Sequence, residues 1–320
     1  MSELIIQPGI NKDSPIAVFI MGPTATGKTD LGMACVASFN SEIISVDSAM
    51  VYREMDIGTA KPDADELAKA PHRLINTCDP LDAYSAGAFR DDALSAMVEI
   101  VDNNAVPLLV GGTMLYFNVL QKGLAELPQA DQSVRQKLDD EVKRVGWAGM
   151  HQRLSEIDPV SAQRIHHNDP QRIHRALEVY EITGKTLTQF WQEQKYEALP
   201  YSVVKIALMP PDRTELRQKI SLRFDQMLDT GFVDEVEKLR ARGDLSPDLP
   251  SIRAVGYRQV WAYLDGEYDY ETMREKAIIA TAQLAKRQMT WLRKETECNF
   301  FDPKSLNSDK LLKNLRNLLL

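Results

Sequence analysis

Cysteine is scarce in this chain of 320 residues, which contains only Cys35, Cys78 and Cys298. The three are odd in number and far apart, which excludes a cysteine-rich metal site. This usage is typical of a reducing compartment. We expect all three to be buried as small apolar side chains.

Long apolar runs are also absent. No segment approaches the roughly 20 consecutive apolar residues that a membrane-spanning helix needs, and the opening segment MSELIIQ lacks the basic start of a signal peptide. The sequence therefore predicts a cytoplasmic protein without a membrane partner. Its length allows one large domain or two.

Positive charge is in deficit, because the formal net charge is −8 at pH 7. A nucleic-acid partner requires Lys and Arg to neutralise its phosphates, so the total argues against one. The basic residues are nevertheless clustered, within 164–167, 172–175, 253–258 and 286–293. The net charge therefore does not exclude a local basic surface on an acidic protein.

The most informative segment that is present reads GPTATGKT, at 22–29. It follows the apolar run Ile16–Ile20, which predicts a buried strand, and precedes a predicted helix, as a phosphate-binding loop does. Lys28 would add a charge at the outer phosphate, and the Thr29 hydroxyl is placed to ligate Mg²⁺. The loop residues expected at the phosphates are Gly22, Thr24, Ala25, Thr26, Gly27, Lys28 and Thr29.

Strand and helix patterns alternate through most of the chain. Buried strands are predicted at 16–20, 42–46, 106–110 and 202–208, the last closing the sheet, and helices at 85–101, within 213–242 and at 271–293. This order predicts an α/β fold with a P-loop NTPase-like parallel sheet flanked by helices. Residues 122–200 instead have helical periodicity without a strand, and helices are predicted there at 133–145, 149–156, 169–183 and 187–196. We expect an all-helical insertion domain at 122–200, within a catalytic core formed by 1–121 and 201–320.

Polar residues follow two more predicted strands, namely Asp47 and, after two glycines, Thr113. Ligands of open parallel sheets bind beyond the carboxyl ends of the strands, so both residues can share a cleft with the phosphate loop. Asp47 has three open roles at this stage: helix cap, Mg²⁺ ligand or catalytic base. Thr113 is either a catalytic hydroxyl or a polar turn residue.

Eight short motifs then occur in a specific order. They are GPTATGKT at 22–29, DSAMVYREMDIGTAKP at 47–62, PHRL at 71–74, GGTMLY at 111–116, NDPQRIHRALE at 168–178, RFDQML at 223–228, RAVGYR at 253–258 and KRQMTWLR at 286–293. Together they resemble the bacterial tRNA dimethylallyltransferases, over about residues 16–293. Met50 departs from the pattern, because many members carry Gln there, and its contact stays open.

The resemblance implies transfer of a dimethylallyl group from dimethylallyl diphosphate to N6 of the adenosine 3′ of the anticodon, in tRNAs that read codons beginning with U. Asp47 would be the general base, since a carboxylate can accept the proton of the amine as the new bond forms. Thr113 and Arg223 would stabilise charge on the departing diphosphate. Mg²⁺ on Thr29 is the implied cofactor.

The resemblance also implies contact with the anticodon stem-loop of tRNA, from which the target base is flipped out. The expected contact residues are Asp47, Ser48, Ala49, Met50, Gln171, Arg172, Arg175, Arg253, Gly256, Tyr257, Arg258, Lys286, Arg287, Trp291 and Arg293. The helical insertion would clamp the stem, and we expect a monomer.

Other interpretations stay open at the level of sequence. The phosphate loop also suits a small-molecule kinase, a nucleotide switch without chemistry, or a prenyltransferase acting on free adenine nucleotides. Arg223 could pair with a neighbouring carboxylate. Lys286, Arg287 and Arg293 could form a solvated face over a core Trp291.

Overall fold

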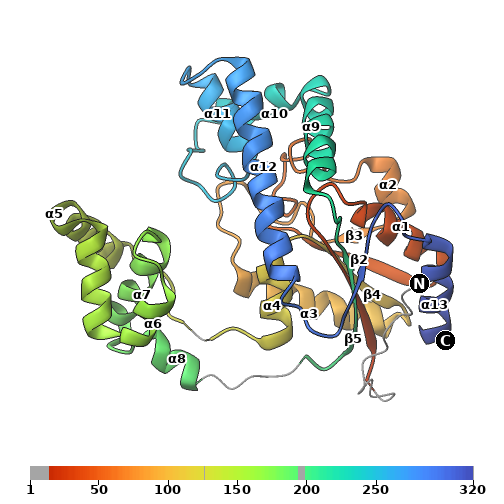
Figure 1. The fold of residues 1–320 in the computed structure, drawn as a ribbon, viewed down its shortest axis with the longest axis horizontal. Coiled ribbons are helices and arrows are strands. Elements are labelled where there is room, and N and C mark those ends of the chain that lie inside the picture. The colour runs from red at the N-terminus through yellow and green to blue at the C-terminus, as the bar shows by residue number, and fades with distance from the viewer. Residues whose placement is uncertain (1–13, 126, 194–198, 320) are drawn as a thin grey trace. The chain divides into compact units, whose positions relative to one another are not determined.

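The computed structural model describes residues 14–125, 127–193 and 199–319. The chain forms two compact units, one comprising Met1–Gln121 with Leu199–Leu320 and the other Lys122–Ala198. Figure 1 follows it by colour from red at the N-terminus to blue at the C-terminus. The opening segment MSELIIQ lies outside the described residues.

The first unit is built on a parallel sheet that has six strands within the described residues, in the order β3-β2-β4-β1-β5-β6. The strands are β1 (Ile16–Met21), β2 (Ser41–Val46), β3 (His72–Arg73), β4 (Val106–Gly111), β5 (Ser202–Leu208) and β6 (Cys298–Phe301). β1 and β4 are continuous apolar runs, and β2 is buried along most of its length although it contains Ser and Glu, as expected for parallel strands covered on both faces. The predicted α/β class is confirmed.

One detail of the predicted sheet is wrong. β5 does not close it, because β6 pairs with β5 and lies at the edge. β3 and β6 are only two and four residues long. Segments of that length carry too little periodicity to be predicted as strands.

Helices cover both faces of the sheet. Those of the first unit are α1 (Lys28–Ser38), α2 (Ala64–Lys69), α3 (Ala86–Asp102), α4 (Met114–Lys122), α9 (Arg213–Asp229), α10 (Phe232–Ala241), α11 (Tyr257–Leu264), α12 (Tyr270–Leu292) and α13 (Ser308–Leu319). On one face Ile20 packs in a core with Leu31 of α1 and Leu315 of α13. On the other, Phe19 packs in a core with Phe117 of α4, their ring centroids 5.2 Å apart.

Helices α9–α12 form a further core with the chain that follows β2, and Figure 1 shows them gathered at the top of the view. Phe232 lies at its centre, with its ring edge-on to those of Phe224 and Tyr257. The predicted helical stretch 213–242 divides at Gly231, whose φ of +97° separates α9 from α10. The fold therefore places a helical layer beside the sheet.

The second unit is all-helical within its described residues. It contains α5 (Gln132–Ile157), α6 (Pro159–Arg164), α7 (Pro170–Thr183) and α8 (Leu187–Glu193) around a core of its own that includes Met150, Leu154 and Leu177. Gly146, with φ of +68°, interrupts α5 between the two helices predicted there. The predicted helix 187–196 ends at Glu193, and residues 194–196 lie outside the described residues.

The structure tests the predicted burial of the cysteines and the predicted lack of a membrane-spanning helix. Cys35 and Cys298 are buried as expected, but Cys78 is only half-buried, in a loop, so that expectation is wrong for Cys78. None of the helices in the described ranges combines the length and the apolar character needed to cross a membrane.

Candidate active site

The carboxyl ends of three neighbouring strands meet at one edge of the sheet. Gly111 of β4 is paired with Met21 of β1 on one side and with Val46 of β2 on the other. The next segments of chain are the phosphate loop, the Thr113 turn and Asp47. Strand register alone therefore brings these three segments together.

A cleft of about 550 Å³ opens at this edge, within the size range of small-ligand sites. The residues predicted for the site that line it are Thr24, Lys28, Thr29, Asp47, Ser48, Ala49, Met50, Thr113, Arg223, Arg253, Gly256, Tyr257, Arg287 and Trp291. All of them belong to the first unit. The predicted loop residues Gly22, Ala25, Thr26 and Gly27 shape the phosphate loop without lining the cleft among the described residues.

The phosphate loop is braced from within. The buried Thr26 hydroxyl donates to the carbonyl oxygen of Pro23 at 2.8 Å, and Lys28 Nζ donates to the same oxygen at 2.7 Å. Gly27, with φ of +79°, ends the loop directly before α1. Since the first N–H groups of a helix lack partners, this helix start favours an anion in the cleft.

Two half-buried cations lie at this loop, Lys28 within it and Arg223 on α9. Burial lowers the pKa of Lys28 to about 8, and repulsion from Arg223 adds to the shift, while Asp47 opposes it. Burial also lowers the pKa of Arg223, against the attraction of Asp47 and Asp30. Among the described residues Arg223 has no hydrogen bond or ion pair, so it is not held by a neighbouring carboxylate. Two poorly solvated cations at one loop make a site for a multiply charged anion.

Asp47 is only partly buried and faces the cleft. Its Oδ1 accepts hydrogen bonds from the backbone N–H groups of Ala49 at 2.8 Å and Met50 at 3.4 Å, and Oδ2 has no hydrogen-bond partner among the described residues. Thr113 Oγ1 accepts the N–H of Ser48 at 3.0 Å. Oδ1 of Asp47 thus stabilises the turn, whereas Oδ2 is available to accept a proton or a ligand.

Glu235 of α10 holds the cleft wall, and sequence reasoning missed it. Its carboxylate accepts hydrogen bonds from the backbone N–H groups of Asp56, Ile57 and Gly58, at 2.7–3.1 Å, and from the Tyr257 hydroxyl at 2.5 Å. A Cβ at Gly58 would lie 2.1 Å from the Phe232 ring, so only glycine fits there. No sequence signal identifies Glu235, because its backbone partners are nearly 180 positions away.

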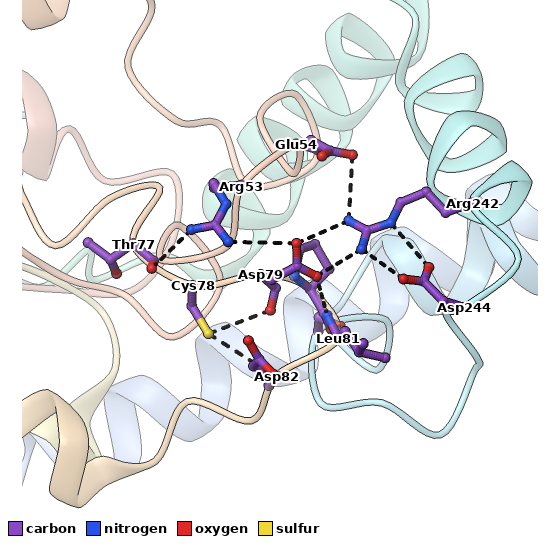
Figure 2. A network of polar contacts seen from close by, with 11 residues as sticks. Arg53, Glu54, Thr77, Cys78, Asp79, Leu81, Asp82, Arg242 and Asp244 are labelled. Carbon is purple, nitrogen blue, oxygen red and sulfur yellow. Dashed lines mark hydrogen bonds and ion pairs between the residues drawn. The ribbon is translucent and has the colours of Figure 1, made fainter.

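Figure 2 shows a second polar network, which joins the loop at 77–82 to Arg53 and to the residues that follow α10. Arg242 donates to Asp79 at 2.9 Å and to Asp244 at 3.0 Å, and Arg53 lies 3.7 Å from Asp79. These contacts lower the pKa of Asp79 below its usual value. Nearby, the buried Ser251 hydroxyl donates to the carbonyl oxygen of Pro80 at 2.5 Å. The segment that leads to Arg253 is thereby tied to the loop at 77–82.

The basic residues predicted for tRNA differ in their positions. Arg253 and Arg287 are exposed and line the cleft, and so does Trp291, which is 39% exposed and therefore not a core tryptophan. Tyr257 lines the cleft but is fully buried, with its hydroxyl held by Glu235. Arg258, Lys286 and Arg293 are exposed and do not line the cleft as the described residues define it.

The other predicted tRNA residues belong to the second unit. Gln171 and Arg172 are exposed at the start of α7, and Arg172 lies 3.4 Å from Asp169. Arg175 donates to the buried Glu178 and to the carbonyl oxygen of Pro128, both at 2.6 Å. Arg175 therefore has a structural role in this unit, whereas Arg172 presents its guanidinium to solvent.

Comparison with known proteins places this site in a family. The IPP transferase family model matches residues 50–295. A tRNA dimethylallyltransferase of Thioalkalivibrio sulfidiphilus is 60% identical over 280 residues, or 88% of each chain, and one of Coxiella burnetii is 57% identical over 293 residues, or 92% of this chain and 94% of the relative.

Solved structures agree with the sequence relatives. The full-length tRNA isopentenylpyrophosphate transferase from Bacillus halodurans has a TM-score of 0.69 at 36% identity and covers 96% of both chains. A eukaryotic dimethylallyltransferase acting on tRNA has a TM-score of 0.79 at 25% identity and covers 95% of this chain and 78% of its own. Together with the ordered motifs and the cleft at the strand ends, these matches show that the chain belongs to the IPP transferase family.

Proposed function

We propose that this protein transfers a dimethylallyl group from dimethylallyl diphosphate to N6 of the adenosine 3′ of the anticodon, in tRNAs that read codons beginning with U. The observation that carries the proposal is one cleft that brings together Lys28 of the phosphate loop, Arg223 and Asp47, with both cations partly desolvated by burial. Relatives that match most of the chain and are named tRNA dimethylallyltransferases support it.

The cleft suits the departure of a diphosphate. As the bond between the allylic carbon and oxygen breaks, negative charge builds on the diphosphate, and cations and hydrogen-bond donors aimed at that charge lower the barrier. Lys28, Arg223 and the backbone N–H groups of the phosphate loop supply them, together with the Thr113 hydroxyl. Because these groups are already in place, little reorganisation accompanies the reaction.

Asp47 is our candidate for the general base. The adenine amino group is a poor nucleophile, because its lone pair is delocalised into the ring. As the N6–carbon bond forms, a proton leaves N6, and the unpaired Oδ2 of Asp47 accepts it. The hydrogen bonds from Ala49 and Met50 to Oδ1 keep the carboxylate oriented toward the cleft.

Mg²⁺ fits this site as an ion that accompanies the diphosphate. The described residues contain no group of three or more His, Cys, Asp or Glu side chains that could hold a metal by themselves. Thr29 lines the cleft, and Mg²⁺ is often held by one or two protein oxygens together with phosphate oxygens and water. When bound there, the ion supplies further positive charge to the diphosphate.

The tRNA side of the proposal uses the basic residues at the cleft mouth. Arg253 and Arg287 would contact phosphates, and the exposed Trp291 offers a face on which an unpaired base can stack. Gln171 and Arg172 of the second unit would contact the anticodon stem. We propose that the protein acts as a monomer, since one chain carries all of these groups.

The proposal is tested with radiolabelled dimethylallyl diphosphate and three acceptors: unmodified tRNA, an anticodon stem-loop and AMP. We expect labelled N6-dimethylallyladenosine from the two RNAs, identified by nucleoside analysis. Preferential labelling of AMP would instead favour the free-nucleotide prenyltransferase, and phosphoryl transfer from ATP would favour the kinase.

The role of Asp47 is tested with Asp47→Asn, whose amide oxygen can still accept the turn hydrogen bonds. We expect kcat to fall by about 10²- to 10⁴-fold, the usual contribution of a general base. Binding of inorganic diphosphate, measured by calorimetry, should persist. An Asp47→Asn enzyme with full activity would refute the assignment.

A further inference from the structure

Gln288 of α12 links two segments of the cleft that the chain sequence keeps far apart. Its Oε1 accepts the backbone N–H of Thr24 at 3.0 Å, and its Nε2 donates to the carbonyl oxygen of Gly112 at 2.9 Å. Thr24 belongs to the phosphate loop, and Gly112 directly precedes Thr113. A single side chain therefore joins the loop to the turn.

The chemistry of the two partners requires a primary amide of this length. The Thr24 N–H only donates and the Gly112 carbonyl only accepts, so the side chain between them must present one acceptor and one donor. Glutamate lacks the donor and methionine lacks both groups. Asparagine has both but is one methylene shorter, so it cannot hold both contacts from the same backbone position.

The contacts continue from Gln288 to the proposed base. A Cβ at Gly112 would lie 2.4 Å from Gln288 Nε2, so the backbone of the turn packs directly on the amide. The adjacent Thr113 accepts the N–H of Ser48, which follows Asp47. A continuous series of hydrogen bonds and short backbone segments therefore runs from the phosphate loop to Asp47.

We propose that Gln288 is a positioning residue for the transfer reaction. It fixes the phosphate loop relative to the Thr113 and Asp47 turns, and so aligns the breaking carbon–oxygen bond with the amine and its proton acceptor. Gln288 acts through these backbone segments and takes no part in the bond changes. This inference rests on the proposed function, because alignment matters only when a diphosphate and a base react in this cleft.

The primary test compares Gln288→Met with Gln283→Met, a matched control on an exposed position of the same helix that does not line the cleft. For Gln288→Met we expect kcat per folded molecule to fall about 10- to 100-fold, because small misplacements of reacting groups slow catalysis by such factors. The affinities for inorganic diphosphate and for the stem-loop should stay near those of the wild-type chain. Gln283→Met should react like the wild-type chain.

Gln288→Asn is the second variant, since it keeps the amide and a similar polarity and should fold if the methionine variant does not. We expect it to show the same selective loss of kcat. Wild-type kcat per folded molecule in either variant, even with a lowered unfolding temperature, would overturn the inference and leave Gln288 as a stabilising residue only.

A double-mutant cycle with Thr113→Val tests the route of the effect. If Gln288 acts through the Thr113 turn, Gln288→Met should cost much less kcat in the Thr113→Val background than in the wild-type background. Losses that multiply independently would overturn the inference. The wild-type assay separates this result from failure of the proposed function, because a chain without prenyl-transfer activity fails before any variant is compared.

Discussion

At the scale of single residues, the site is defined by positive charge held where water solvates it poorly. Burial lowers the pKa of Lys28 and of Arg223, and repulsion from Arg223 lowers that of Lys28 further. Asp47 offsets part of this cost for both cations. A diphosphate bound beside the two cations would offset the remaining cost of keeping them charged, so this electrostatic gain contributes directly to substrate binding.

The pKa of Lys28, about 8, predicts how diphosphate affinity depends on pH. Below this value the side chain is charged, and above it the proton is lost, so affinity should be constant near pH 7 and fall as the pH rises through 8. Well above 8 the loss approaches about tenfold per pH unit, because one proton is linked to binding. Calorimetry with inorganic diphosphate between pH 6.5 and 9.5 measures this.

Lys28→Arg is the control for ionisation of the diphosphate itself, since arginine stays charged throughout this range. Its affinity should lack the decline attributed to the lysine proton. If the two proteins had the same pH profile, Lys28 would not be the titrating group.

At the scale of elements, strands were more predictable than the contacts that hold the cleft. β1, β2, β4 and β5 are mostly buried, predominantly apolar segments of six or seven residues, and all four are predicted from the sequence. Strand order in turn brings Asp47 and Thr113 beside the phosphate loop. The short β6 was missed because its four residues belong to a sheet only through pairing with β5.

The parts of the site that sequence reasoning missed depend on contacts over long separations. Gln288 and Glu235 are a glutamine and a glutamate on helices, residue types that usually face solvent. Their backbone partners are 176 to 264 positions away in the chain. No local periodicity encodes such a contact, so it becomes visible only when α10 and α12 are packed.

The hydrogen bonds of Glu235 predict how much α10 contributes to the stability of the cleft wall. In Glu235→Ala the N–H groups of residues 56–58 and the Tyr257 hydroxyl lose their acceptor. We expect the free energy of unfolding to fall by about 2–4 kcal/mol, because water and local relaxation replace only some of these bonds. Urea denaturation followed by circular dichroism measures the change.

Glu237→Ala is the matched control, because Glu237 is exposed on the same helix. Its stability should stay close to that of the wild-type chain. Equal stability of the two alanine variants would show that the Glu235 hydrogen bonds make no net contribution to stability.

At the scale of the whole molecule, the two units have separate cores. The core of the second unit includes Leu138, Met150 and Leu177 and contains only residues of that unit. The three cores of the first unit contain none of its residues, and Leu199, where the chain re-enters the first unit, packs against one of them. All the residues that line the cleft also belong to the first unit.

This separation predicts the effect of replacing residues 122–198 with a short flexible linker, while retaining Leu199. The phosphate loop, Lys28 and Arg223 keep every described contact, so calorimetry should show diphosphate affinity close to that of the full chain. Affinity for a fluorescent anticodon stem-loop, measured by anisotropy, should be lost, because the contacts proposed for Gln171 and Arg172 go with the deleted unit. Undiminished stem-loop binding would refute that role. Loss of diphosphate binding, in a variant that still unfolds cooperatively, would show instead that the first unit depends on the second.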